Sequence, residues 1–71
     1  MAGMSFGQAF SKLFRESGMT QAEYARRSGF STAYVSMLLS GEIKDPKFTR
    51  ACEIADALGV TLQDFHDLMR K

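Results

Sequence analysis

Four glycines divide the chain into short segments, and this spacing limits the fold more than any other feature of the sequence. Each follows a stretch in which apolar residues recur every three or four positions; they are Gly18, Gly29, Gly41 and Gly59. Glycine readily adopts the left-handed conformation that commonly ends an α-helix, so each of these positions predicts a helix end. Two stretches, Ser5-x-x-Gln8 and Thr20-x-x-Glu23, fit the capping box, in which two side chains bond free backbone N–H groups at a helix start.

Other patterns predict the remaining helix starts. Ser31 and Thr61 are hydroxyl residues flanked by apolar ones, as in the hydrophobic staple. Asp45-Pro46 combines an acidic cap with a proline at the first helical position. We therefore predict five helices, at about residues 5–17, 21–28, 32–40, 46–58 and 62–69. No segment predicts a strand.

Apolar residues at helical spacing predict the core. The predicted core comprises Phe6, Phe10, Leu13, Phe14, Tyr24, Ala25, Val35, Leu38, Leu39, Phe48, Ala51, Ile54, Ala55, Leu58, Leu62, Phe65, Leu68 and Met69. Because the links between helices are only two to five residues long, neighbouring helices must pack against each other directly. The predicted fold class is therefore all-α, a compact five-helix bundle.

The size of the chain sets further limits. A chain of 71 residues forms one domain at most, so we expect residues 1–71 to be a single domain with a marginal core. The single cysteine, Cys52, excludes an internal disulfide and a zinc finger, and we interpret it as a core or boundary residue. His66 stands alone, so we expect no metal site.

Neither the membrane nor catalysis is indicated. No apolar run approaches the ~20 residues that a membrane helix needs, and MAGMSFGQ at the N-terminus lacks the regions of a signal peptide. We therefore expect a cytoplasmic protein. Nucleophile elbows, glycine-rich phosphate loops and paired-carboxylate motifs are also absent, so we expect no enzyme, no cofactor and no small-molecule substrate.

Charge is distributed unevenly along the chain. Residues 1–50 carry seven Lys or Arg and four Asp or Glu, whereas residues 51–69 carry four acids and no Lys or Arg. One half of the molecule can therefore face a polyanion while the other half stays in solvent. Glu42 and Asp45 lie beside Lys44 and Lys47 and would oppose a polyanion, so non-specific affinity for such a partner should be weak and salt-dependent.

Residues 20–40 form a predicted helix-turn-helix, in which a tight turn joins two short helices. Ala25 is small where the two helices cross, Gly29 allows the turn, and Val35 anchors the second helix to the core. The specificity of this pattern is only moderate, since the same spacing occurs by chance in any helical protein.

With these residues the chain resembles the Cro/C1-type helix-turn-helix family, the phage-repressor-like (XRE) DNA-binding domains with the lambda-repressor-like fold. The likeness covers roughly residues 5–69. The first matching stretch comprises Thr20-Gln21-Ala22-Glu23, Ala25, Gly29, Val35, Leu38 and Gly41. The second comprises Ile54-Ala55-Asp56-Ala57-Leu58-Gly59-Val60, Leu62 and Phe65, and the 41–48 stretch resembles a loop that some phage repressors lay along the DNA backbone.

The resemblance implies a small, repressor-like transcriptional regulator that binds double-stranded DNA, with the 32–40 helix in the major groove. The implied base contacts are Thr32, Ala33, Ser36 and Met37. The implied phosphate contacts are Gln21, Tyr34, Ser40, Lys44 and Lys47. Since one reading helix supplies little affinity, we expect a homodimer at least on DNA, with Leu68 and Met69 as candidate interface residues. Their alternative role is simply to end the core.

Some residues depart from the family pattern. The family often has Gln, Arg, Ser or Asn where this chain has Ala33 and Met37, and neither residue can make the bidentate bonds that distinguish guanine or adenine. Three interpretations remain open. The helix reads DNA by thymine-methyl contacts, few hydrogen bonds and shape; it is kept only as a stable fold; or it belongs to a protein-interaction module, such as an antitoxin or an anti-repressor partner. Tyr34 and Met37 are types favoured in protein interfaces, which supports the last.

Phe14 and Leu39 form a second departure, because some relatives carry an ion pair between the first and third helices at these positions. A packed apolar pair there can be at least as stable as a buried salt bridge.

Overall fold

Five helices form close to the predicted residues. The computed structural model describes residues 3–70. Their helices are α1 (Phe6–Ser17), α2 (Gln21–Ser28), α3 (Thr32–Ser40), α4 (Phe48–Leu58) and α5 (Leu62–Met69). No strand occurs among the described residues, which confirms the all-α, five-helix prediction. None of these helices has the length and apolar character needed to span a membrane.

Both predicted capping boxes are present. The Ser5 hydroxyl accepts a hydrogen bond from the Gln8 N–H at 3.2 Å, and the Gln8 side chain accepts one from the Ser5 N–H at 2.9 Å. Thr20 and Glu23 repeat the arrangement at the start of α2. There the Thr20 N–H donates to the carboxylate and holds the pKa of Glu23 below its ordinary value of 4.5.

The glycines that follow the first four helices all have positive φ angles, between 75° and 87°. This confirms the predicted helix ends, since only glycine adopts such angles without strain from a Cβ atom.

The start of α4 differs from the prediction. We expected the helix to begin at Pro46 behind an Asp45 cap, but it begins at Phe48, with Lys47 extended and no side-chain cap. The reason is that proline fixes φ near −65°, an angle shared by helices and extended chain. Pro46 is therefore compatible with both a helix and an extended chain. The link that begins at Gly41 continues to Lys47, and the first turn of α4 begins at Phe48.

Most of the predicted core is buried or half-buried, with two exceptions. Phe48 is 75% exposed, so its assignment to the core was wrong. It lies on the same side of α4 as the buried Ala55, but at the first helical position, where no neighbouring helix covers it. Met69 at the end of α5 is 37% exposed, so it lies at the margin of the core and not within it.

Aromatic rings join the helices at the centre of the bundle. The Tyr24 ring packs edge-on against Phe10 and Phe14, with centroids 5.3 Å and 6.0 Å apart. Its hydroxyl donates to the Ile54 carbonyl at 2.8 Å, which satisfies the only polar atom of a fully buried side chain. Burial raises the pKa of Tyr24, so the phenol stays protonated. Tyr24 thus ties α2 to both α1 and α4.

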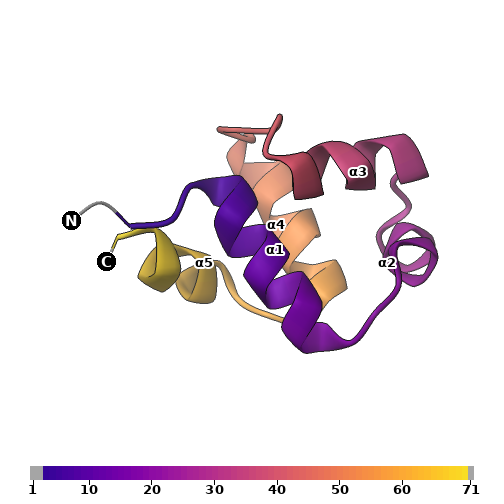
Figure 1. The fold of residues 1–71 in the computed structure, drawn as a ribbon, viewed down its shortest axis with the longest axis horizontal. Coiled ribbons are helices and arrows are strands. Elements are labelled where there is room, and N and C mark those ends of the chain that lie inside the picture. Colours follow the sequence, from indigo (N-terminus) through magenta and orange to yellow (C-terminus); the bar gives the residue numbers. More distant parts are fainter. Residues whose placement is uncertain (1–2, 71) are drawn as a thin grey trace.

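The helix-turn-helix and α5 lie at opposite ends of the molecule. Figure 1 shows α5 and the residues that lead into α1 at one end, and α2 with the start of α3 at the other. The Met4 N–H donates to the Leu68 carbonyl at 3.2 Å, which holds the start of the chain against α5.

A close approach between backbones sets the position of α3 on α1. A Cβ atom added at Gly7 would lie only 2.6 Å from the Gly41 Cα, which is the residue that ends α3. The Ser11 hydroxyl also donates to the Leu39 carbonyl at 3.3 Å. Leu39 itself is half-buried and Phe14 is buried, so both apolar departures from the family pattern belong to the packed interior.

Candidate nucleic-acid interface

One side of α3 faces solvent along its whole length. Successive residues are about 100° apart around a helix, and the buried Val35 and Leu38 mark the inner side. The residues on or beside the opposite side are all exposed: Thr32, Ala33, Ser36, Met37 and Ser40. We call these five residues the outer wall of α3. It contains every base contact that the sequence implied, together with one of the phosphate contacts.

Helix α2 supports one flank of the outer wall. Gln21, the first residue of α2, is exposed, and its side-chain oxygen accepts a hydrogen bond from the Ser36 hydroxyl at 3.4 Å. Because the oxygen is used in this way, the Gln21 amide nitrogen remains available as a hydrogen-bond donor. We expected Gln21 at this interface, and in the structure it lies beside the outer wall.

The other flank is an aromatic cluster. Tyr34 is half-buried and lies about 160° around α3 from Ser36. Its ring packs edge-on against Phe30, with centroids 5.0 Å apart. The Arg50 guanidinium lies 5.0 Å from the Phe30 centroid and 5.3 Å from the Tyr34 centroid, which are cation–π distances.

Arg50 is a residue that the sequence analysis missed. It lies in the first turn of α4, its side chain is 46% exposed, and its Nε is 3.4 Å from the Glu53 carboxylate. The stacking holds a long, exposed cation beside the start of α3. No pattern in the sequence indicated this contact, because it joins residues 16 and 20 positions apart through the packing of α4 against the helix-turn-helix.

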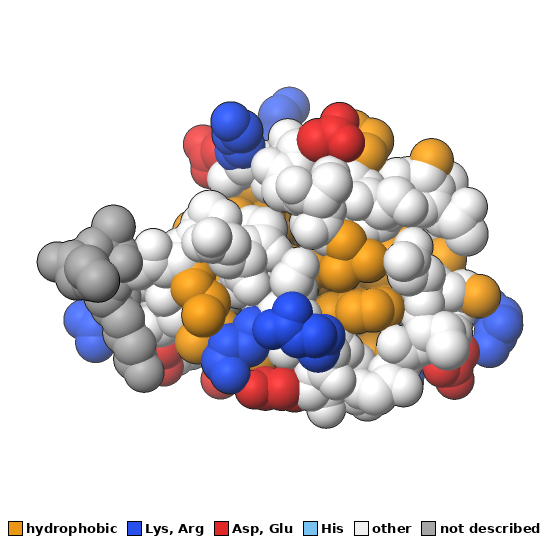
Figure 2. Space-filling view, in the orientation of Figure 1, with side chains coloured by type: hydrophobic (Ala, Val, Ile, Leu, Met, Phe, Trp, Pro, Cys, Tyr) orange, Lys and Arg blue, Asp and Glu red, His pale blue; other side chains and the backbone are white. Residues whose placement is uncertain are grey.

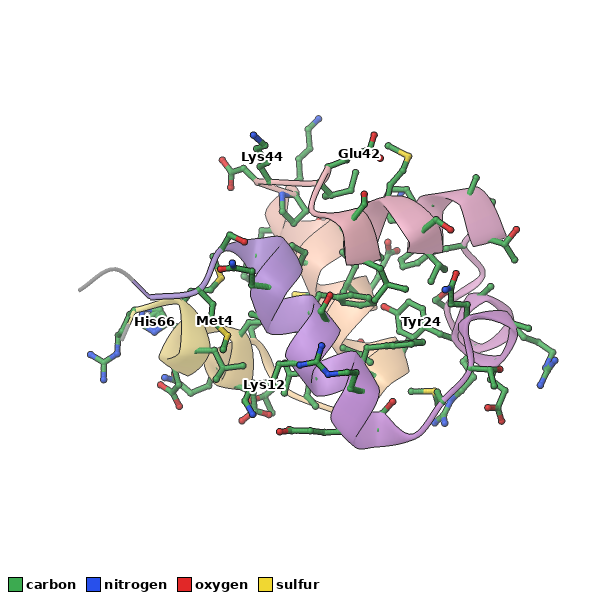
Figure 3. All side chains as sticks on the ribbon, in the orientation of Figure 1. Met4, Lys12, Tyr24, Glu42, Lys44 and His66 are labelled. Atoms are coloured by element: carbon green, nitrogen blue, oxygen red, sulfur yellow. The ribbon has the colours of Figure 1, made fainter. Side chains whose placement is uncertain are left out.

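The link between α3 and α4 carries mixed charge. Lys44 and Lys47 are both exposed, as expected, and so are Glu42 and Asp45. Figure 3 shows Lys44 and Glu42 pointing away from the body of the molecule at the edge that α3 forms. In Figure 2, both basic and acidic side chains lie along this same edge. The Glu42 carboxylate accepts from the Ser40 hydroxyl at 3.0 Å, so one negative charge lies at the end of the outer wall.

The two candidate dimer residues lie elsewhere. Leu68 is half-buried against the core, whereas Met69 is partly exposed at the end of α5. Both are on the helix that Figure 1 places at the opposite end from α2. The structure therefore does not bring them together with the outer wall. Cys52 is half-buried and His66 is exposed, and no group of three metal-ligating side chains occurs within residues 3–70.

A capped short helix, a glycine turn and a second short helix with a solvent-facing wall define a protein of the helix-turn-helix class. The comparison with known families agrees. The helix-turn-helix family model matches residues 11–65, so the chain belongs to this family, in its Cro/C1-type form. Membership makes the chain a DNA-binding regulator by class, and not an enzyme.

The chain is 46% identical over 55 residues to a protein of Sinorhizobium fredii described as an uncharacterized HTH-type transcriptional regulator, y4dJ. The match covers 78% of this chain and 70% of that protein. No solved structure shows a significant match.

Proposed function

We propose that residues 1–71 act as a single-domain, repressor-like transcriptional regulator that binds a specific double-stranded DNA sequence with α3 in the major groove. The observation that carries this proposal is the exposed outer wall of α3, held between two supported flanks. An α-helix with its side chains is roughly 10–12 Å across, and the major groove is about 12 Å wide. The width of a helix therefore supports placing the outer wall of α3 in the groove.

Phosphate contacts would grip the DNA on both sides of α3. Gln21 would donate its free amide nitrogen on one flank, and Tyr34 and Arg50 would act on the other. Ser40, Lys44 and Lys47 would follow the sugar-phosphate backbone along the α3–α4 link. Such contacts set the register of the protein on the duplex, while the outer wall of α3 reads the bases.

We further propose that two copies bind a symmetric site. One short reading helix supplies little affinity, and linking two copies makes the second contact effectively intramolecular. Half-sites about one helical turn apart would allow both α3 helices to enter the same face of the DNA. Leu68 and Met69 are the candidate interface, because the partial exposure of Met69 leaves apolar surface for a second copy.

Salt dependence tests DNA binding directly. The three cations Lys44, Lys47 and Arg50 predict a slope of about −3 for log affinity against log salt per protomer, since each phosphate contact contributes roughly −0.9. Lys47→Ala should reduce the slope by about one and weaken binding to all sequences alike. Thr32→Ala should instead change the preferred base at one position of a selected site.

Lys12→Ala is the matched control. Lys12 lies on α1, away from the Lys44 edge in Figure 3, and it pairs with Glu16 at 2.6 Å. Its removal changes the net charge as much as the loss of Lys47, yet it should leave the salt slope unchanged. Equal effects of both variants would argue against the proposed surface.

A protein-interaction module on the same fold is the alternative function. The Glu42 carboxylate at the end of the outer wall favours it, because a negative charge there opposes DNA. An antitoxin or an anti-repressor partner would use such a surface for protein contacts. A salt slope near zero, or no retardation of duplex DNA at low salt, would support this alternative.

A further inference from the structure

The outer wall of α3 presents apolar methyl groups at the positions where a DNA-reading helix needs its readers. Ala33 and Met37 are both exposed and both end in a methyl group. None of the nine residues of α3 is Arg, Lys, Asn or Gln, so the helix has no bidentate partner for guanine or adenine. The apolar feature of the major groove is the methyl group at C5 of thymine.

We infer that this protein reads C5-methyl groups of pyrimidines, through packing of Ala33 and Met37 against them. The ligand class is thus duplex DNA that bears thymine or 5-methylcytosine at two positions of each half-site. This inference rests on the proposed DNA-binding function and names what that same surface recognises.

Intramolecular bonds already use the two serine hydroxyls of the outer wall, those of Ser36 and Ser40. The Ser36 hydroxyl donates to Gln21, and the Ser40 hydroxyl lies within bonding distance of the Met37 carbonyl at 3.1 Å and the Glu42 carboxylate at 3.0 Å. A hydroxyl has only one hydrogen to donate. In each of these serines, an acceptor within the protein is therefore already available for that hydrogen before DNA binds. Reading by serine donors would first break these bonds, whereas methyl packing leaves them in place.

The spacing of the two methyl groups sets the spacing of their targets. Ala33 and Met37 are four residues apart, which is about 6 Å along the helix axis. Base steps are about 3.4 Å apart along each strand, so the two methyl groups match pyrimidines roughly two steps apart. The long, unbranched and polarizable Met37 side chain can adjust to the second methyl, and its 37% exposure leaves it free to do so.

Comparing the affinity for duplexes that carry thymine, uracil, 5-methylcytosine or cytosine at one position distinguishes recognition of the methyl group from recognition by hydrogen bonds. The preferred site is first selected from a random duplex library, and each thymine in it is then replaced by uracil, 5-methylcytosine or cytosine. Uracil keeps the hydrogen-bonding edge of thymine without the methyl, and 5-methylcytosine keeps the methyl on the edge of cytosine. Burying one methyl group is worth about a fourfold change in affinity.

We expect two positions at which the methyl group matters. At each, a duplex with thymine should bind about fourfold more tightly than one with uracil, and a duplex with 5-methylcytosine about fourfold more tightly than one with cytosine. In Met37→Gln this methyl effect should vanish at one of the two positions, whereas the apolar Met37→Leu control should keep it. Circular dichroism checks that both variants fold.

The contrary results are distinct. Equal binding of thymine and uracil at every position overturns the inference, as does a selection that enriches no sequence although binding is salt-dependent. Failure of the wild-type protein to retard any duplex at low salt overturns the proposed function itself, and the inference with it.

Discussion

Replacing Gly7 with alanine should destabilise this protein, although the same change stabilises most helices. Alanine is preferred to glycine inside a helix by up to about 1 kcal/mol. Here the new Cβ atom would lie 2.6 Å from the Gly41 Cα and 3.3 Å from the Gly41 nitrogen. Carbon atoms normally approach to about 3.5–4.0 Å, so α1 and the end of α3 must separate by about 1 Å.

The expected size of this effect follows from two opposing terms. Overpacking typically costs about 1–3 kcal/mol, which exceeds the propensity gain at this position near the start of α1. We expect a net loss of about 1–2 kcal/mol in the free energy of unfolding. In a domain of this size that corresponds to a fall in Tm of roughly 5–15 °C.

Thermal unfolding followed by circular dichroism measures this loss, and a peptide supplies the control. In an isolated peptide of residues 3–18, which lacks Gly41, Gly7→Ala should raise helicity. The intact protein should respond in the opposite direction. A higher Tm for Gly7→Ala in the intact protein would refute the argument that this contact holds α3 in place.

Three further predictions use the buried phenol, an acidic cap and the stacked arginine. Tyr24→Phe should lower the free energy of unfolding, measured in urea, by about 1 kcal/mol, because it removes the 2.8 Å hydrogen bond to Ile54. Tyr34 is half-buried, so Tyr34→Phe should change this free energy by less than about 0.5 kcal/mol. Equal losses in the two variants would contradict this prediction. The Thr20 N–H lowers the pKa of Glu23, so the folded protein binds a proton at this carboxylate less readily than the unfolded chain does. The ionised Glu23 therefore stabilises the fold above pH 4.5, and this stabilisation is lost as the pH falls through the lowered pKa. Thermal unfolding between pH 6 and 3 should therefore show a smaller acid loss in Glu23→Gln than in wild type, and parallel curves would exclude this role. Arg50→Ala should reduce the salt slope of DNA binding by about one, and Arg50→Lys should restore it; an unchanged slope in the alanine variant would remove this residue from the phosphate contacts.

Local interactions made most of the fold predictable. Capping boxes join residues only three positions apart, so Ser5 and Thr20 could be recognised without knowing anything about the neighbouring helices. The glycine ends are equally local, because the left-handed angle depends on the residue itself. Burial is different: Phe48 has an apolar side chain on the core side of α4, yet nothing in its own helix shows that no neighbour reaches it.

Tertiary contacts explain what the sequence did not predict at the candidate site. The position of Arg50 over Phe30 and Tyr34 depends on how α4 crosses the helix-turn-helix. The role of Gly7 is also tertiary, since it ends no helix and has no unusual φ angle; its importance comes only from Gly41 across the interface. Both contacts join different helices, and the spacing of apolar residues along a helix does not specify the angle at which it crosses another helix.

The residues that identify the family and the residues that we propose to select the DNA sequence are largely different. Family features such as Ala25, Val35 and Gly29 are buried or end a helix, so folding constrains them. Ala33 and Met37 contact solvent, and the fold tolerates many side chains at such positions. A fold recognised with ease can therefore carry a reading surface of unusual chemistry, and the absence of bidentate readers (Arg, Lys, Asn or Gln) from α3 is no argument against DNA binding. It points instead to the methyl groups of the major groove as the feature that this surface distinguishes.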